Sequence, residues 1–386
     1  MNASHVPGAA GAPGEIIGAR LGVEHAIAGR IFPAAGLEVG SSAGALWSDA
    51  LGTLTFDAGS SPARLDTPFD LASLTKVLVT TTVLMELVRK GRVRLDDPVS
   101  DFFNEWRGAD RAHVTVRDLL EHASGLPARL VDAPPGSRHE FEHEICRIKL
   151  EYEPRAQSIY SDLGFILLGF LAADRGGAPL PELFDRIAAQ TYVGSGNVGS
   201  GNVGSGFSRI DDGLFSSLTF DLPPESKKLA APTLPLAEDL RRGRSLSGEV
   251  HDNYAAALGG AAGHAGLFGD APAVGAFARL ILRAARGDRD LPAPFFPELV
   301  AEFTTKSTVP GSSRALGWDT MLPTSSCGTG MSPKAFGHVG FTGTSVWVDP
   351  VRDRYFVLLT NRACGGGSLD DMRTVRRAFH DALADL

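Results

Sequence analysis

The residues of this sequence best suited to chemistry begin with a serine and a lysine, Ser73 and Lys76, in the run D-L-A-S-L-T-K. We expect a helix over residues 73–90, and residues three apart on a helix project from the same face. A serine hydroxyl becomes a strong nucleophile when a base takes its proton, and a lysine can be that base where its surroundings disfavour the ammonium form. A helix N-terminus also supplies backbone N–H groups for an oxyanion. The alternative is a surface lysine behind a helix-capping serine, because so short a motif also arises by chance.

A tyrosine and an aspartate two positions apart, Tyr160 and Asp162, stand just before the apolar run 165–171. Both side chains can face a cleft from the edge of one element. A tyrosine relays protons when its hydroxyl lies near a cation that favours the phenolate. The alternative is a tyrosine packed at a helix start, with Asp162 as the helix cap.

A third motif, G-H-V-G-F-T-G, covers residues 337–343 and leads into an expected strand over residues 344–349. Glycines let a substrate lie against an edge strand, where a backbone N–H can serve an oxyanion hole. The alternative is a Gly-rich turn with a solvated His338.

The elements that must position these motifs are strands at both ends of the chain and helices in the middle. Hydrophobic periodicity predicts the following elements: a helix over 16–31, strands within 36–57, the helix over 73–90, several short helices within 92–190, a hairpin of 344–349 and 355–360, and a helix over 370–386. This order predicts an α/β (α+β) fold that is split by an all-helical insertion. We assign residues 1–75 and 265–386 to the α/β domain and 76–264 to the helical one, with the site in the cleft between them.

The composition excludes several classes of protein. The chain has 386 residues, with 37 Lys and Arg against 45 Asp and Glu, and its net charge of −8 includes no basic run. Nucleic acid and anionic membranes are therefore not expected as partners. No apolar run is long enough to cross a bilayer, and the first residues lack a signal-peptide pattern. We expect a cytoplasmic protein as the sequence is written, or a periplasmic or secreted one if a signal was removed.

No cofactor or metal is expected either. The three cysteines are scattered without a C-x-x-C pair, and neither a phosphate-binding loop nor an H-E-x-x-H motif is present. His251, Asp252 and His264 are expected to have a structural role at the rim of the cleft. His122 is expected at a helix end beside a turn.

The glycine content of 45 residues is partly due to a five-residue repeat, V-G-S-G-N, over residues 193–206. Such a Gly/Ser tract is typical of a flexible spacer without chemistry, or of an engineered segment, and the sequence leaves open which of the two it is. A natural functional loop is the alternative.

The three motifs, in this order, resemble the signatures of the serine β-lactamase and penicillin-binding-protein superfamily, whose set is Ser-x-x-Lys, Tyr-x-Asn and Lys-Thr-Gly or His-x-Gly. The flanks G-R-V-R-L-D-D-P-V, E-H-A-S-G-L-P and G-G-A-A-G-H-A-G-L-F resemble the class C-like branch, which also holds D-alanyl carboxypeptidases and esterases. The resemblance runs from about residue 15 to the end, except for the Gly/Ser tract. It implies a β-lactamase/transpeptidase-like fold, in which helices flank an antiparallel sheet.

The resemblance also implies roles for single residues. Ser73 would be the nucleophile, Lys76 its activating base and Tyr160 the proton relay. The backbone N–H groups of Ser73 and Phe341 would form the oxyanion hole.

Three further residues, Asp162, His338 and Gly340, would bind the substrate by the same resemblance. The sequence departs from the family pattern at two of them. Asp162 replaces the usual asparagine, which removes an amide donor and adds negative charge beside Lys76. His338 stands where many relatives carry a lysine. Both departures argue against a specialised, fast antibiotic-degrading enzyme.

We therefore expect a serine hydrolase that acts through an acyl-enzyme on a β-lactam, a D-alanyl peptide or an ester. Its partner would be a small-molecule or peptide substrate. The alternative is a catalytically idle peptidoglycan- or ligand-binding protein on the same fold. The sequence leaves the preferred acyl donor and the oligomeric state open.

Overall fold

The two ends of the chain meet in the middle of one six-stranded antiparallel sheet. The computed structural model describes residues 13–130, 134–193 and 217–386, so the Gly/Ser tract lies outside the described residues from position 194 onward. The strand order is β2-β1-β8-β7-β6-β5. The strands are β1 (Ala34–Ser41), β2 (Gly44–Gly52), β5 (Asp319–Thr320), β6 (Phe336–Val339), β7 (Ser345–Asp349) and β8 (Arg354–Thr360).

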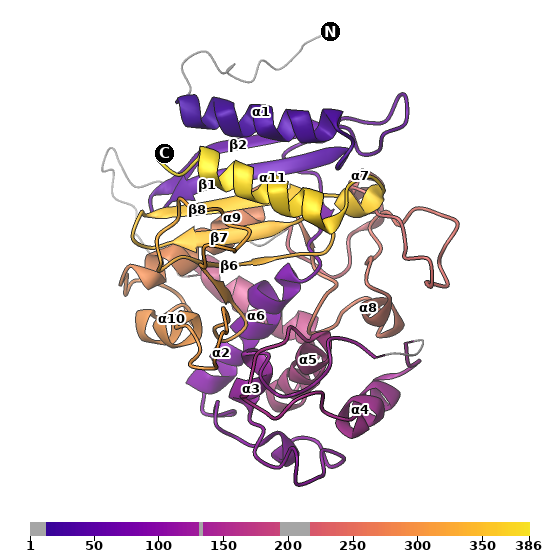
Figure 1. Ribbon diagram of the computed structural model, residues 1–386, viewed down its shortest axis with the longest axis vertical. Coiled ribbons are helices and arrows are strands. Elements are labelled where there is room, and N and C mark those ends of the chain that lie inside the picture. Colours follow the sequence, from indigo (N-terminus) through magenta and orange to yellow (C-terminus); the bar gives the residue numbers. More distant parts are fainter. Residues whose placement is uncertain (1–12, 131–133, 194–216) are drawn as a thin grey trace.

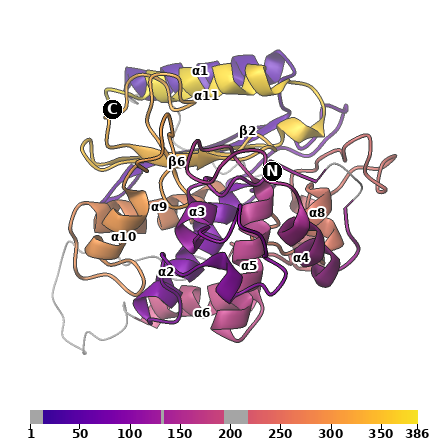
Figure 2. The same ribbon diagram turned by 60° about the horizontal axis from the view of Figure 1, so that its bottom comes forward.

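Helices cover both faces of this sheet. Helices α1 (Gly14–Ala28) and α11 (Leu369–Ala382) lie on one face, and α9 (Ala271–Ala285) lies on the other (Figures 1 and 2). Successive side chains of a strand point to opposite faces, so each strand serves two cores. Leu37 and Phe356 share a core with α1 and α11. Val357 and Leu359 share the other core with α9.

Most of the remaining helices form a group below the α9 face of the sheet (Figure 2). They are α2 (Thr82–Arg89), α3 (Val116–Leu120), α4 (Arg138–Arg147), α5 (Asp162–Gly176), α6 (Leu180–Val193), α8 (Asn253–Ala257) and α10 (Pro297–Thr304). The other helical segments between β2 and β5 are η1 (Lys76–Thr81), η2 (Val99–Asp101) and α7 (Pro224–Leu229). A short ladder of β3 (Phe69–Asp70) and β4 (Phe268–Gly269) joins the two parts, and η3 (Arg362–Cys364) follows β8. The sheet, its flanking helices and the helical middle all agree with the sequence prediction. The domain boundaries at residues 75 and 264 stay predictions.

The predicted helix over 73–90 is present, but its first part is wound differently. Residues 76–81 form the π-helix η1, and α2 continues from it. The hydroxyl of Thr82 donates to the carbonyl of Val77 five residues earlier, and that of Thr80 donates to the carbonyl of Gly263. The bond from Thr80 is a tertiary contact, and burial of this segment overrides the weak helix propensity of threonine.

Helix α5 is buried along most of its length in the helical part. Within the described residues, no single helix is long and apolar enough to cross a membrane. Only α5 together with residues 180–191 of α6 meets that criterion, and the two helices are bent by 67°.

A buried carboxylate, Glu38 on β1, lies beneath α9. Its two oxygens accept hydrogen bonds from Tyr355 Oη at 2.8 Å and Ser48 Oγ at 3.0 Å. A Cβ at Gly275 of α9 would lie 1.9 Å from Glu38 Oε1, so only glycine fits there. Burial raises the pKa of Glu38 to about 7, and the two hydrogen bonds only partly oppose this shift.

We predict that Glu38→Gln stabilises the protein above neutral pH. Because the folded protein favours protonated Glu38, it binds more protons than the unfolded chain between the usual pKa of 4.5 and about 7. Its stability therefore falls as the pH rises through this window, by about 3 kcal/mol in all. Urea unfolding from pH 4.5 to pH 8 should show this loss in the wild type and a flatter profile in Glu38→Gln. Matching profiles would contradict the prediction, and Glu24→Gln on the outer face of α1 is the control.

Candidate active site

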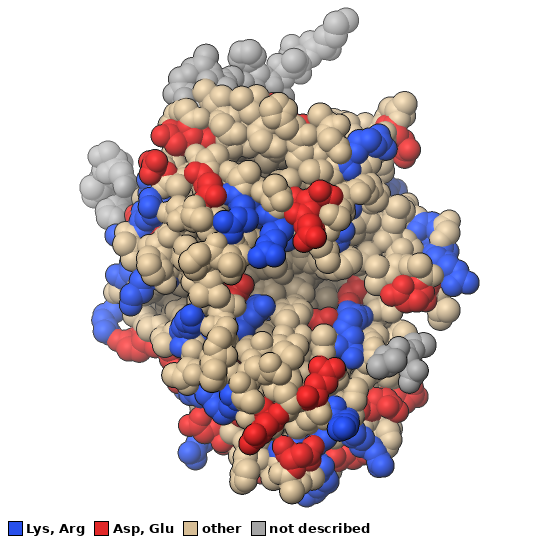
Figure 3. Space-filling model, viewed as in Figure 1, with Lys and Arg blue, Asp and Glu red and all other residues tan. Residues whose placement is uncertain are grey.

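The largest hollow on the face in Figure 3 lies between the sheet and the helical part, and charged side chains stand at its margin. The pocket has a volume of about 470 Å³. All but one of the residues predicted to form the site line it, and these are Ser73, Tyr160, Asp162, His338, Gly340 and Phe341. Lys76 lies directly behind them and is fully buried. Motifs separated by more than 250 positions in the sequence therefore meet at one place.

The loop that carries Ser73 is fixed by the carboxylate of Asp70, at the end of β3. Asp70 Oδ1 accepts from the backbone N–H of Ala72 at 2.8 Å, and Oδ2 accepts from that of His251 at 2.6 Å. Ala72 has a φ of 48°, a left-handed conformation that is unfavourable for a residue with a side chain. The buried carboxylate holds this turn in place, and Ser73 follows it directly.

Ser73 Oγ lies within hydrogen-bond distance of two other predicted residues. Lys76 Nζ donates to it at 3.1 Å, and Tyr160 Oη lies 2.7 Å away. Lys76 Nζ also donates to Asp162 Oδ1 at 2.7 Å and to the carbonyl of His264 at 3.1 Å. An ammonium group has three protons, and here each of them has an acceptor. A surface lysine behind a capping serine is thereby excluded.

The electrostatics of the site favour a charged lysine and a neutral tyrosine. Burial acts to lower the pKa of Lys76, but Asp162 and Tyr160 together outweigh it, Asp162 first, and the pKa is raised above its ordinary value. Burial likewise raises the pKa of Tyr160, although the positive charge of Lys76 opposes this. The role of Lys76 as the base calls for a site that disfavours the ammonium form, whereas Asp162 favours that form, so this role stays a prediction. Because burial raises its pKa, Tyr160 is a neutral phenol before a substrate binds.

Asp162 is free to pair with Lys76 because another residue caps helix α5. The hydroxyl of Ser161 accepts from the backbone N–H of Gly164, so Asp162 is not the cap. Although burial acts to raise the pKa of Asp162, nearby positive charges, that of Lys76 first and that of Arg129 among the others, together lower it below its usual value. This aspartate therefore stays ionised beside the lysine.

Asp162 also begins a chain of charged and polar groups that the sequence did not reveal. Its Oδ2 accepts from Arg129 Nη1 at 2.9 Å, and the same nitrogen lies 2.9 Å from Asp252 Oδ2. Asp252 Oδ1 in turn lies 2.8 Å from His264 Nε2. His264 and Asp252 were expected at the rim, but Arg129 was missed because it belongs to none of the motifs. The sequence offered one indirect signal for such a partner: a carboxylate that is buried, as Asp162 is, needs further hydrogen-bond donors besides Lys76. Among the described residues, no group of three or more His, Cys, Asp or Glu could hold a metal ion.

His338 on β6 is a buried, neutral hydrogen-bond acceptor. Its Nδ1 lies 2.8 Å from the carbonyl oxygen of Val339, which can only accept, so Nδ1 carries the proton. Burial lowers the pKa of His338 well below its ordinary value. Its Nε2 is buried without a hydrogen-bond partner among the described residues. The alternative of a solvated histidine on a Gly-rich turn is therefore wrong.

His122 follows α3, as the sequence indicates, but its role in the site was missed. It has a φ of 55°, and its Nδ1 accepts from the backbone N–H of Ser161 at 3.0 Å. Its ring lies 4.7 Å from that of Tyr160, measured between centroids. His122 thus supports the back of the tyrosine that contacts Ser73.

The turn after β6 comes very close to the Ser73 loop. A Cβ at Gly340 would lie 2.1 Å from Thr344 Oγ1 and 2.8 Å from the carbonyl oxygen of Leu71, so only glycine allows this approach. The hydroxyls of Thr342 and Thr344 donate to the carbonyls of Asp70 and Leu71. The ring of Phe341 stands at the margin of the pocket and stacks on that of His251, with 5.3 Å between centroids.

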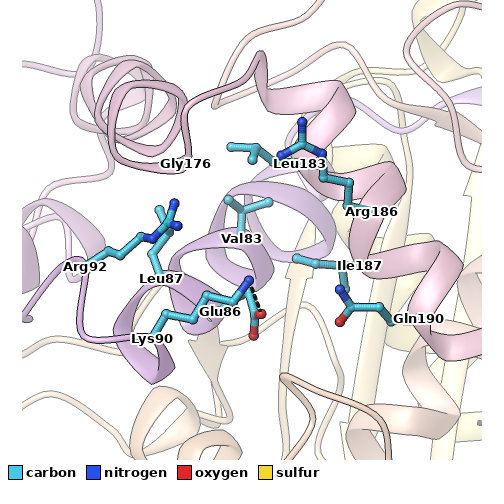
Figure 4. Close-up of a pocket in the computed structure, with 10 residues that line it drawn as sticks. All are labelled: Val83, Glu86, Leu87, Lys90, Arg92, Gly176, Leu183, Arg186, Ile187 and Gln190. Carbon is cyan, nitrogen blue, oxygen red and sulfur yellow. Dashed lines mark ion pairs between the residues drawn. The ribbon is translucent and has the colours of Figure 1, made fainter.

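A smaller pocket of about 170 Å³ lies between α2 and α6 (Figure 4). Its floor is formed by aliphatic side chains, including Val83 and Leu183. Glu86 is already paired with Lys90 at 2.9 Å, and the residues that line this pocket include no serine, cysteine or histidine. It offers no nucleophile, so the larger pocket is the candidate site.

Comparisons with known proteins show the family to which the chain belongs. The Beta-lactamase family model matches residues 41–380. A protein of Escherichia coli named "Putative D-alanyl-D-alanine carboxypeptidase" is 31% identical over 326 residues, which cover 78% of this chain and 70% of that protein. A protein of the same name from Salmonella gallinarum is 30% identical over 333 residues, with the same coverage.

Solved structures share the fold at much lower identity. EstCE1, described as a hydrolase with promiscuous acyltransferase activity, aligns with a TM-score of 0.72 at 18% identity and covers 96% of this chain and 98% of its own. A penicillin-binding protein homologue from Caulobacter crescentus gives 0.70 at 19% identity with the same coverage. A class C β-lactamase from Rhodobacter sphaeroides gives 0.69 at 17%, with 95% and 98% covered. The predicted fold class is thereby confirmed.

We predict that Asp162→Asn destabilises the protein by about 3–5 kcal/mol near neutral pH, because it leaves the buried Lys76 ammonium without its carboxylate. The lowered pKa of Asp162 means that this contribution is present above its unfolded pKa and is lost as the pH falls through the folded value. The difference between wild type and variant should therefore shrink in acid. Urea unfolding at several pH values measures it.

The matched control is Asp174→Asn, which breaks the exposed ion pair with Arg138. It should cost less than about 1 kcal/mol. Equal losses in the two variants would show that the Lys76–Asp162 pair does not carry the stability assigned to it.

Proposed function

Because the chain belongs to the Beta-lactamase family, which includes β-lactamases, carboxypeptidases and esterases, we propose that it is a serine hydrolase acting through an acyl-enzyme on Ser73. One observation carries the proposal. Ser73 Oγ is contacted at once by Lys76 Nζ at 3.1 Å and Tyr160 Oη at 2.7 Å, at the wall of the pocket of about 470 Å³. A nucleophile needs a neighbouring group to move its proton, and this serine has one within reach.

The first half of the reaction is acylation. Ser73 Oγ attacks the carbonyl carbon of the substrate, and the backbone N–H groups of Ser73 and Phe341 receive the negative charge that develops on the carbonyl oxygen. Either hydroxyl of the Ser73–Tyr160 pair can donate the hydrogen bond between them. The proton of Ser73 therefore passes to Tyr160 Oη while Tyr160 gives its own proton to the leaving group. Breaking the bond to the leaving group yields the Ser73 ester.

The second half reverses these steps with water. A water molecule takes the place of the leaving group and gives a proton to Tyr160, which returns one to Ser73 Oγ as the ester bond breaks. Tyr160 is a phenol before and after each half. Its raised pKa is compatible with this relay, because no free phenolate has to accumulate.

Lys76 serves this reaction as a fixed positive charge. Asp162 keeps it protonated, so it stabilises the negative charge that develops on Ser73 Oγ and Tyr160 Oη during proton transfer. It therefore contributes without accepting a proton itself.

Esters and peptides are the substrates we propose, ahead of β-lactams. The names of the relatives support a peptide or ester: one group is called putative D-alanyl-D-alanine carboxypeptidase, and EstCE1 is called a hydrolase with acyltransferase activity. Asp162 has no amide proton to donate to a β-lactam side chain, and His338 is a neutral acceptor rather than a cation. Both features remove contacts to an acylamino group and a carboxylate, which a β-lactam carries and a simple ester lacks, so the residues favour an ester. A peptide carries the same two groups, and its support comes from the names of the relatives.

We predict that Ser73→Ala abolishes covalent labelling by a fluorophosphonate or a fluorescent penicillin, because the alanine has no oxygen to acylate. Gel fluorescence of the wild type and the variant measures this. Ser226→Ala, on α7 and outside the pocket, should label like the wild type. Labelling that survives in Ser73→Ala would place the nucleophile elsewhere. A wild type that neither labels nor turns over any donor would favour the binding-protein alternative.

We predict that kcat/KM for p-nitrophenyl acetate exceeds that for nitrocefin by about tenfold or more, because a missing hydrogen bond to a bound substrate costs that much or more. Initial rates with these two substrates and a D-alanyl-D-alanine peptide give the three values of kcat/KM and so the order of preference. Faster hydrolysis of nitrocefin than of the ester and the peptide would overturn this preference.

A further inference from the structure

A buried arginine on the C-terminal helix contacts the turn that carries Phe341. Arg376 of α11 is 6% exposed, and its Nη2 donates to the carbonyl oxygens of Gly340 at 2.7 Å and Thr344 at 2.8 Å. Helix α11 lies on the face of the sheet away from the helical part (Figure 2). The arginine therefore reaches the turn from behind the proposed oxyanion hole.

The contact with Gly340 acts on the same amide as the proposed oxyanion donor. The carbonyl of Gly340 and the N–H of Phe341 belong to one peptide unit. In a planar trans peptide the C=O and N–H bonds point in opposite directions. An anchor on the Gly340 oxygen therefore fixes the direction of the Phe341 N–H. The backbone N–H of Gly343 donates to the same oxygen at 3.1 Å and adds to this anchor.

The charge of Arg376 also makes that N–H a better donor. A charge-assisted hydrogen bond to an amide oxygen is roughly twice as strong as a neutral one, and bonds in a chain polarise one another in a low-dielectric interior. Burial, and then the charge of Arg362, lower the pKa of Arg376 to about 9, so it remains charged at neutral pH. Its Nε is buried without a hydrogen-bond partner among the described residues. The hydrogen bonds that Arg376 donates therefore go to this turn.

A second arginine provides an internal comparison. Arg362, in η3, donates through Nε at 3.1 Å and Nη2 at 2.5 Å to the carbonyl of Phe341. That carbonyl belongs to the next peptide unit, whose N–H is on Thr342. Arg362 thus binds the same turn with the same type of hydrogen bond. It acts on the Phe341–Thr342 amide, however, which does not contain the Phe341 N–H.

We propose that Arg376 is a positioning residue for the oxyanion hole, which orients and polarises the Gly340–Phe341 amide from behind the site. This inference rests on the proposed function, because the Phe341 N–H matters only if an acyl-enzyme forms. It gives the C-terminal helix a part in the reaction although α11 contributes no nucleophile or proton carrier.

The test is the carbonyl stretching frequency of the acyl-enzyme, formed with an ester that carries ¹³C at its carbonyl. Stronger hydrogen bonds to an acyl carbonyl lower its stretching frequency, and this quantity does not respond to a general loss of stability. Infrared difference spectra should show a higher frequency in Arg376→Gln than in the wild type. We also expect kcat to fall about tenfold with less than a twofold change in KM, since the interaction is strongest in the transition state. Arg362→Gln should leave the frequency at the wild-type value.

The outcomes are distinct. A labelled band at the same frequency in the wild type and Arg376→Gln overturns the inference and leaves the proposed function intact. A wild type that gives no acyl band contradicts the proposed function itself. If circular dichroism shows that Arg376→Gln is unfolded, Arg376→Lys replaces it. Its side chain is one bond shorter and cannot reach both carbonyls at the present geometry, so its band should also lie above that of the wild type, and an unchanged band overturns the inference.

Discussion

The buried ion pair between Lys76 and Asp162 is the interaction on which the rest of the site depends. A lysine with no exposed surface is costly to bury unless its ammonium protons all find acceptors, and here Asp162, Ser73 and a backbone carbonyl receive them. The pair ties the π-helix η1 to the start of α5, and Arg129 extends it. This arrangement stabilises the fold and favours a charged lysine and a neutral tyrosine, and in the reaction that we propose Tyr160 carries the proton.

The second constraint is the close approach of two backbone segments that lie far apart in the sequence. The loop before Ser73 and the turn after β6 are joined by threonine hydroxyls, and Gly340 leaves no room for a side chain between them. Asp70 holds the first segment from one side, and Arg376 holds the second from behind. The two N–H groups proposed for the oxyanion hole thus belong to backbone that is fixed by buried charged side chains. Such preorganisation is what stabilises a charge that exists only in a transition state.

Much of this could be predicted from the sequence, for reasons that particular residues show. The helix over 16–31 and the hairpin near the C-terminus follow from local periodicity, which a strand or helix must have to bury one face. Ser73, Lys76, Tyr160 and His338 stand in short motifs, so their proximity could be inferred once the resemblance was recognised. Arg129 and Arg376 carry no local signal, since an isolated arginine in a loop or on an amphipathic helix is ordinary. Their partners are carboxylates and carbonyls more than 30 residues away, which no local pattern encodes.

The sequence by itself determined the chemistry that is available: a serine, a lysine, a tyrosine and a Gly-rich turn on a sheet flanked by helices. Only the tertiary structure decided the protonation states of these groups and the direction of their hydrogen bonds. Lys76 was expected as a base, and Asp162, which lies 2.7 Å from its Nζ inside the protein, raises its pKa and so favours the ammonium form. The sequence left open whether His338 is solvated or binds the substrate. In the structure it is a buried neutral acceptor, because Nδ1–H donates to the carbonyl of Val339 on the same strand and leaves Nε2 without a proton. The physical reason is that a pKa and a tautomer depend on burial and on neighbours in space, and these neighbours are distant in the sequence.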